Sequence, residues 1–248
     1  MTHERLLRAD LHTHTNFSKD GITPPNVFVT ELLRQSIGIV AITDHDTMDG
    51  IPPIQDAILS QSAGITVISG IEITTGTPNQ NDKNIELLAY YLSEPVSSGL
   101  NLSQTIQEVA KQKGIISIPH PFELWRHGAG EEVEAIIAYA TEAGVPVAIE
   151  IFNARALPGF NKRSENSLAR FQNTIYTAGS DGHHPLELGR AGLLLVVPSN
   201  EVYDKNWLLL NLRNKPQVFG EANPLTTFIL RLLVKFEKKR QAKMKPLP

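Results

Sequence analysis

Short apolar runs alternate with segments of helical periodicity along most of the chain. Runs such as IGIVAIT and GIISIPH have strand length, and EEVEAIIAYATEA repeats its apolar positions at helical spacing. Strands are predicted over residues 6–12, 37–43, 65–73, 85–92, 114–120, 145–152, 174–180 and 191–197. Helices are predicted over residues 24–36, 49–63, 103–113, 131–143, 164–173 and 204–214. Strands that alternate with helices in this way predict an α/β fold with a mainly parallel sheet.

The number of strand–helix units favours a barrel over an open sheet. About seven units fit into roughly 220 residues, which is typical of a single barrel-like domain. Neither a G-x-G-x-x-G nor a G-x-x-x-x-G-K-[ST] motif opens a predicted helix. The sequence therefore gives no support to nucleotide binding by those two loops.

The C-terminal segment, residues 224–248, is predicted to be one amphipathic basic helix. Seven of the 23 Lys and Arg residues, but one of the 26 Asp and Glu residues, lie between Arg231 and Pro248. The segment is therefore formally +6 and the rest of the chain −9. We expect the apolar stripe to dock on a barrel formed by residues 1–223, with a peripheral membrane or partner contact as the alternative. The stripe consists of Phe228, Ile229, Leu232, Leu233 and Phe236.

Composition limits the chemistry that the chain can support. The 248 residues contain no cysteine, which excludes disulfides and thiolate metal sites. The first residues, MTHERLLRAD, lack the apolar core of a signal peptide, and no run is long enough to span a bilayer. We expect a cytoplasmic protein without stable membrane insertion. The acidic body argues against a broad nucleic-acid surface.

Histidines and acids follow the predicted strands at their carboxyl ends. In DLHTHTNFSKDG, His12 and His14 point to the same side of a strand, and Asp20 follows shortly after. Five further strands end in similar residues: Asp44, His45 and Asp46, then Glu72, His120, Glu150 with Asn153, and Asp181 with His183 and His184. In an α/β barrel these ends meet on one face, so the pattern predicts a clustered metal site.

The motifs DLHTHT with SKDG, ITDHDT, GIEIT, PHP and GSDGHH, in this order, resemble those of the polymerase-and-histidinol-phosphatase (PHP) superfamily, in its metal-dependent phosphoesterase branch. The resemblance covers about residues 1–200. It implies a distorted (β/α)₇ TIM-like barrel with two or three divalent metal ions at the carboxyl ends of the strands.

The resemblance also implies a ligand set. The residues that match ligand positions are His12, His14, Asp20, His45, Glu72 as the bridging carboxylate, His120, Asp181 and His183. One further position, histidine or cysteine in some branches, has no such residue in GVPVAI (144–149). We expect Asn153, or a water molecule, to take that place.

Ligands without thiolate suit Mn²⁺, Fe²⁺ or Zn²⁺. We expect catalysis to centre on Glu72, His45 and Asp181, with a metal-bridging hydroxide attacking phosphorus and His45 or Asp181 assisting proton transfer. Arg126 and Arg155 follow metal-bearing strands and are predicted to bind phosphate. Trp125 and Phe122 would either stack on a base or serve in packing.

These features predict a phosphoesterase that hydrolyses a phosphomonoester of a small molecule, of the nucleotide 3′,5′-bisphosphate type. One alternative is a 5′-3′ exonuclease on short oligonucleotides. Another is a non-catalytic, metal-stabilised module that binds a partner. Only 47 residues separate Glu72 from His120, which leaves no room for a large inserted cap and predicts an open site.

Overall fold

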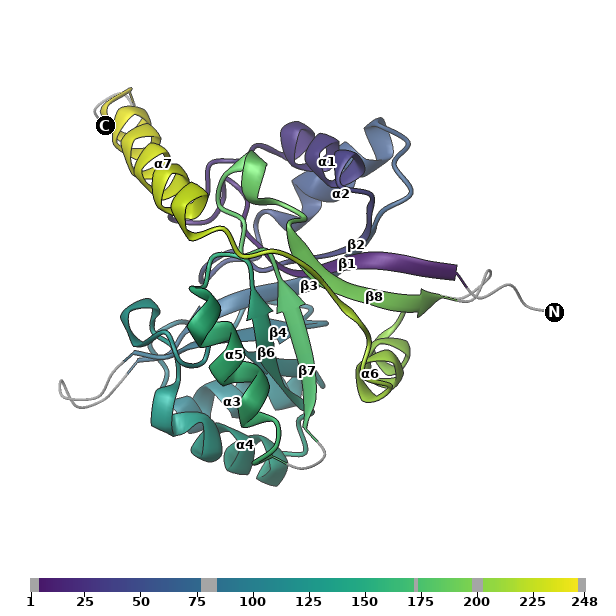
Figure 1. The fold of residues 1–248 in the computed structure, drawn as a ribbon, viewed down its shortest axis with the longest axis vertical. Helices are drawn as coiled ribbons and strands as arrows, with labels where there is room; N and C mark the ends of the chain where they lie inside the picture. The colour runs from purple at the N-terminus through teal and green to yellow at the C-terminus, as the bar shows by residue number, and fades with distance from the viewer. Residues whose placement is uncertain (1–4, 77–83, 172–173, 198–202, 245–248) are drawn as a thin grey trace.

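The computed structural model describes residues 5–76, 84–171, 174–197 and 203–244 (Figure 1). The strands are β1 (Arg5–Thr13), β2 (Ile37–Ile42), β3 (Thr66–Thr74), β4 (Glu86–Tyr90), β5 (Ile115–Ile118), β6 (Val147–Asn153), β7 (Ile175–Gly179), β8 (Ala191–Val197) and β9 (Val218–Gly220). The helices are α1 (Pro25–Arg34), α2 (Ile51–Ser60), α3 (Leu102–Lys111), α4 (Val133–Glu142), α5 (Pro158–Ser167), α6 (Lys205–Arg213) and α7 (Pro224–Met244), with short 3₁₀ turns η1 (Leu124–Arg126), η2 (Gly130–Glu132) and η3 (Pro185–Glu187).

The first seven strands form a nearly closed barrel, which confirms the predicted fold class. The strand order is β7-β6-β5-β4-β3-β2-β1-β8-β9. Backbone hydrogen bonds close the barrel at its carboxyl end: the Asp181 N–H donates to His12 O (2.7 Å), and the His14 N–H donates to Gly182 O (3.1 Å). A Cβ atom on Gly179 would lie 2.7 Å from the backbone nitrogen of His12, so only glycine permits this approach.

One barrel strand runs against the others. Strand β4 is antiparallel to both β3 and β5, whereas the remaining barrel pairs, β1–β2, β2–β3, β5–β6 and β6–β7, are parallel. The expected parallel sheet is therefore correct except at β4, which follows β3 without an intervening helix. The outer strands β8 and β9 are also added antiparallel, to β1 and to β8 respectively.

Helices cover the barrel on both sides, with α1 and α2 against β2 and with α3 and α4 on the opposite side (Figure 1). Side chains of α6 pack on an apolar cluster that includes Leu11, Ile68 and Tyr90. The helix ends follow local signals: the Asn101 side chain caps α3 in a capping box with Gln104, and Asp204 caps α6.

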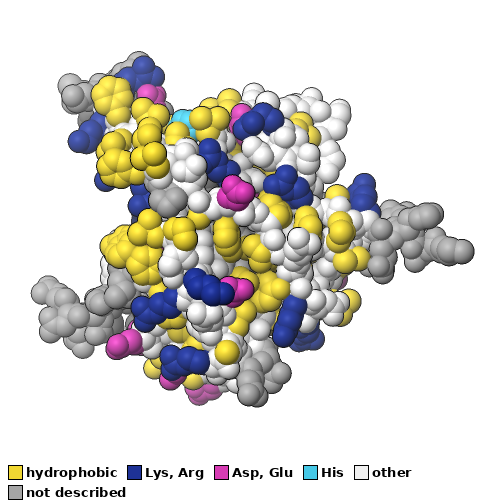
Figure 2. All heavy atoms as spheres, viewed as in Figure 1, with side chains coloured by type: hydrophobic (Ala, Val, Ile, Leu, Met, Phe, Trp, Pro, Cys, Tyr) yellow, Lys and Arg dark blue, Asp and Glu magenta, His cyan; other side chains and the backbone are white. Residues whose placement is uncertain are grey.

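Two predictions are wrong in detail. Helix α5 occupies Pro158–Ser167 instead of residues 164–173, because Pro158 fits the first helical turn; residues 172–173 lie outside the described part. The predicted stripe of α7 does not dock on the barrel, since Phe228, Leu232 and Phe236 are 60%, 52% and 68% exposed. Figure 2 shows this apolar face in contact with solvent. Among the described helices, none is long and apolar enough to cross a membrane.

Candidate metal centre

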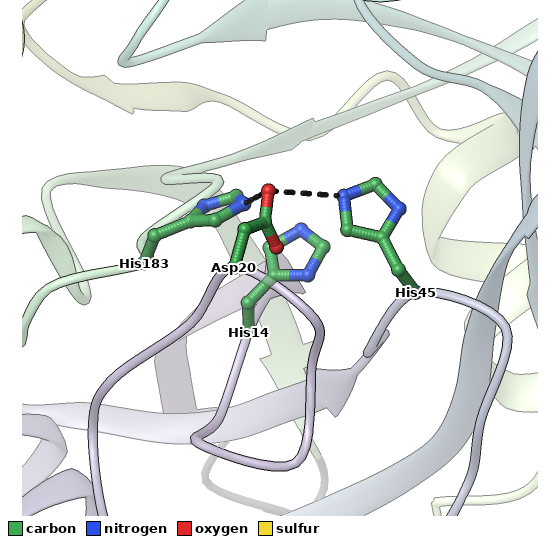
Figure 3. A group of neighbouring side chains, drawn as sticks. All are labelled: His14, Asp20, His45 and His183. Carbon is green, nitrogen blue, oxygen red and sulfur yellow. Dashed lines mark ion pairs between the residues drawn. The ribbon is translucent and has the colours of Figure 1, made fainter. Parts of the chain in front are cut away.

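The predicted ligands meet at the carboxyl end of the barrel, although they come from segments far apart in the sequence. Figure 3 shows one group, in which the Asp20 carboxylate lies among three imidazole rings. Its Oδ2 atom is 3.0 Å from Nε2 of His183 and 3.6 Å from Nε2 of His45. The ring centroids of His14 and His183 are 4.0 Å apart.

Glu72 lies at the centre of the cluster and is 1% exposed. Its Oε2 atom is 3.3 Å from Nε2 of His12, 3.2 Å from Nε2 of His14 and 3.5 Å from Nδ1 of His45. Its other oxygen, Oε1, is 3.3 Å from Nε2 of His120. A single carboxylate thus faces four imidazole rings from both of its oxygens, as a bridging ligand would.

The donor atoms fit metal ions. Four groups of side chains have ligand atoms within 4.8 Å of one another: His14–Asp20–His45–His183, His12–Glu72–His120, His12–His14–Asp181 and His45–Glu72–Glu86. Nε2 of His14, Nδ1 of His45 and Oε1 of Glu72 are buried and have no hydrogen-bond partner among the described residues. Buried polar atoms are costly without a partner, and a metal ion would supply the partner here.

Glu86 is a member of the cluster that the sequence analysis missed. Its Oε1 atom is 3.6 Å from Nδ1 of His45, and its Oε2 atom is 3.8 Å from Nε2 of His120. Glu86 is the first residue of β4, and because β4 is antiparallel its amino end lies beside the carboxyl ends of the other strands. The short connection from β3 to β4 was the signal that could have revealed it, because a connection without a crossover helix implies a hairpin.

Glu150 and Asn153 lie behind the ligands on β6. The Asn153 side-chain amide donates to Glu150 Oε2 and to Asp181 Oδ2, both at 3.0 Å, while its oxygen accepts from the Arg155 N–H at 3.0 Å. Glu150 Oε1 is 2.9 Å from Nδ1 of His12. In this arrangement Asn153 holds two carboxylates in place, and its role as a direct ligand stays a prediction.

Two acids and one histidine of the same sequence pattern accept hydrogen bonds from nearby loop and strand residues instead of joining the cluster. Asp44 accepts hydrogen bonds from the N–H (2.6 Å) and hydroxyl (2.7 Å) of Thr15. Asp46 accepts from the N–H (2.7 Å) and hydroxyl (3.0 Å) of Thr74. Nδ1 of His184 accepts from the Leu186 N–H and caps η3. These residues fix the loops that carry the ligands.

The histidines of the cluster differ in pKa. Burial lowers the pKa of the His12 imidazole, but the Glu150 and Glu72 carboxylates outweigh burial and raise this pKa to about 10. Burial likewise opposes protonation of His45, whereas Glu72 and Asp20 raise its pKa to about 9. Burial and the Arg126 charge lower the pKa of His120 to about 4, and burial and the Arg155 charge lower that of His183 to about 4.

The two predicted phosphate-binding arginines both reach the cluster. The Arg126 guanidinium forms ion pairs with Asp181 and with Glu123 (2.7 Å). The Arg155 guanidinium contacts Nδ1 of His183, and lies 3.4 Å from both Asp181 Oδ1 and Glu187 Oε1. Both side chains are at most 12% exposed and face ligand residues.

Two of the predicted ligands occupy strained backbone positions. His120 and Asp181 have φ angles of 29° and 55°, in the left-handed region that residues other than glycine rarely adopt. Such positions persist only where the surrounding structure enforces them, and they concentrate at functional sites. The fold therefore holds these two side chains in a defined orientation.

The cluster opens to solvent through a cavity of about 360 Å³, which we call the mouth. Its volume lies within the range of small-molecule sites. Residues that line it are Lys19, Asp20, His45, Glu72, Glu86, His120, Trp125, Arg126, His127, Arg155, Asp181, His183, Arg231, Val234 and Lys235. Trp125 is 61% exposed and packs edge-on against Phe160, whereas Phe122 lies under the Arg163 guanidinium.

Parts of the sequence are similar to known proteins. Residues 10–113 match the family model of the PHP domain. An uncharacterized protein of Methanocaldococcus jannaschii is 29% identical over 126 residues, which are 47% of this chain and 68% of that protein. The 5′-3′ exoribonuclease Rnm of Salmonella typhimurium is 39% identical over 66 residues, which are 27% of this chain but only 22% of the exoribonuclease.

The fold has relatives among solved structures. A two-domain protein of Bacteroides vulgatus that contains a predicted PHP-like metal-dependent phosphoesterase superposes with a TM-score of 0.63 at 18% identity, over 92% of this chain and 70% of that one. PHP phosphoesterases and nucleases are metal-dependent hydrolases that act on phosphoester bonds. In its matched segment, its barrel and its cluster of predicted ligands, this chain is similar to proteins of the PHP superfamily.

Proposed function

We propose that this protein is a phosphoesterase that binds two or three divalent metal ions and hydrolyses a phosphomonoester of a small molecule, of the nucleotide 3′,5′-bisphosphate type. The observation that carries the proposal is the convergence of His12, His14, His45, Glu72 and their neighbours at a mouth that Arg126 and Arg155 also line. Several of the buried ligand atoms have no hydrogen-bond partner among the described residues. When bound, Mn²⁺, Fe²⁺ or Zn²⁺ would lower the pKa of water and neutralise the phosphoryl oxygens.

The residues of the chain would then orient the substrate. Arg126 and Arg155 present planar guanidinium groups beside Asp181 and His183, where a phosphate at the metal ions would lie. A guanidinium group can donate two parallel hydrogen bonds to the oxygens of a phosphate. Hydrolysis forms a bond from water oxygen to phosphorus and breaks the ester bond. His45 and Asp181 are our candidates for assisting the proton that must reach the leaving oxygen.

A short oligonucleotide is the second candidate substrate, cleaved from its 5′ end. Two observations favour it: the match to the Salmonella exoribonuclease, and the exposed Trp125 ring at the mouth, on which a base could stack. The acidic body of the chain and the small volume of the mouth weigh toward the small molecule. A non-catalytic binding module would not need so complete a set of ligands.

The test is an assay of metal-loaded protein with adenosine 3′,5′-bisphosphate, adenosine 5′-phosphate and a 5′-labelled pentaribonucleotide, each with Mn²⁺, Fe²⁺ or Zn²⁺. We expect release of phosphate from the bisphosphate, and loss of at least about 100-fold of that rate in Glu72→Ala. Release of mononucleotides from the labelled RNA at a higher kcat/KM would favour the exonuclease. Turnover of no substrate with any of the metals would leave the binding module as the function.

A further inference from the structure

Helix α7 forms part of the wall of the mouth. Its side chains Leu230 and Val234 are 4% and 5% exposed, so one face of the helix packs on the body of the protein. From that side of the helix, Arg231, Val234 and Lys235 line the same cavity as Glu72, His45 and the other ligands. The C-terminal helix and the ligand cluster therefore share one site.

A hydrogen bond fixes the helix to the loop that carries Asp20. Nζ of Lys238 donates to the backbone oxygen of Ser18 at 2.9 Å. The Ser18 hydroxyl in turn donates to Oδ1 of Asp20 at 3.0 Å. Lys235, about one helical turn before Lys238, lines the mouth.

The cations of α7 differ from the two arginines deeper in the site. Arg126 and Arg155 are paired with carboxylates of the ligand region, Asp181 among them. Arg231 and Lys235, by contrast, form no ion pair with any residue that the structure describes. Arg231 is half-buried, and burial and the Arg126 charge lower its pKa although Glu123, Glu187 and Asp20 oppose this. An anion bound close to Arg231 would stabilise its charge further.

We propose that Arg231 and Lys235 bind a second anionic group of the substrate, remote from the phosphate that is hydrolysed, so that α7 selects substrates with two anionic groups. This inference rests on the proposed function, because it assigns Arg126 and Arg155 to the reacting phosphate. Arg231 and Lys235 are positioning residues for substrate, and they do not touch the reacting atoms.

Charge-removing substitutions test the inference. Arg231→Gln and Lys235→Gln are compared, singly and together, with Arg240→Gln, which removes the same charge from the opposite side of α7, where the exposed Arg240 pairs with Glu237. For adenosine 3′,5′-bisphosphate we expect KM to rise by about 10- to 100-fold in the double variant, with kcat changed by less than about threefold. KM for adenosine 5′-phosphate should stay within about threefold, and Arg231→Lys should keep most of the affinity.

A binding measurement separates this inference from the proposed function. Calorimetric titration with adenosine 3′,5′-bisphosphate is done on Glu72→Gln, in which hydrolysis is suppressed, with and without the double substitution. Binding at least about tenfold weaker with the double substitution supports the inference. Equal binding, or equal weakening for the bisphosphate and the monophosphate, overturns it. Failure of the wild-type protein to hydrolyse any nucleotide would contradict the proposed function and leave this binding result unaffected.

Discussion

Nδ1 of His12, a member of the ligand cluster, lies 2.9 Å from Oε1 of Glu150, and both side chains are buried. This contact leaves Nε2 of His12 directed at Glu72 and Asp181. The second oxygen of Glu150, Oε2, accepts a hydrogen bond from the backbone N–H of His120 at 2.7 Å. A carboxylate behind a ligating histidine fixes the ring and raises its basicity, so Glu150 supports two ligands without being one of the clustered groups.

The substitution Glu150→Gln should weaken metal binding by about 10- to 100-fold, because the amide cannot stabilise the His12 ring as the carboxylate does. Competition with a fluorescent chelator measures the affinity. Glu165→Gln is the control, since Glu165 is an exposed acid paired with Lys162. Equal affinity of the two variants would contradict the role of Glu150.

Two adjacent histidines should behave differently. His183→Ala removes a member of a candidate ligand group and should lower the bound metal measured by elemental analysis, together with at least about 100-fold of the hydrolytic rate. His184→Ala removes only the cap of η3 and should keep the full metal content. A full metal content in His183→Ala would contradict the assigned cluster.

Metal binding should release protons and strengthen with pH. In the metal-free cluster the pKa values of His12 and His45 are about 10 and 9, so both rings are protonated at neutral pH. Ligands bind metal in their deprotonated form, and the apparent affinity should therefore rise by roughly tenfold per pH unit for each proton released, between pH 6 and 9. Proton release on adding Mn²⁺ to weakly buffered protein, followed with an indicator dye, checks this. Binding without a change in pH would argue against it.

Removal of metal should lower the melting temperature. Nε2 of His14, Nδ1 of His45 and Oε1 of Glu72 have no hydrogen-bond partner among the described residues, and bound ions would coordinate them. An ion at 100 times its Kd contributes about 2.7 kcal/mol, which corresponds to roughly 5–10 °C for a chain of this size. Differential scanning calorimetry before and after EDTA treatment, with re-addition of Mn²⁺, measures the shift. An unchanged melting temperature would show that bound ions do not stabilise the fold.

The two faces of α7 should respond differently to truncation. Leu230→Ala removes a buried side chain, costs about 2–5 kcal/mol of packing and should loosen the helix, so that trypsin cleaves within residues 224–244 faster. Leu232→Ala alters an exposed side chain on the same helix and should leave the cleavage rate unchanged. Equal rates for the two variants would show that α7 does not pack as described.

Much of this molecule could be predicted from local patterns. Alternation of apolar runs and helical segments indicates the barrel, and the topology of a barrel brings the carboxyl ends of its strands together. His12, His14, His45, Glu72, His120, Asp181 and His183 follow from that rule, and the structure does place them in one cluster.

What could not be predicted depends on tertiary structure. Glu86 follows a polar loop and looks like the start of one more parallel strand, yet the hairpin reverses β4 and turns its first residue toward the ligands. In α7, apolar residues such as Phe228, Leu230 and Leu233 cover most of the circumference. Periodicity therefore did not indicate that Leu230 and Val234 would be the buried pair.

The closure between β1 and β7 has a consequence for how the protein is made. His12 and His14 emerge from the ribosome before Asp181 and His183, which follow six more barrel strands. The predicted metal site is therefore complete only after β7 has been synthesised, so that full binding of metal ions would be a late step in the synthesis of the protein.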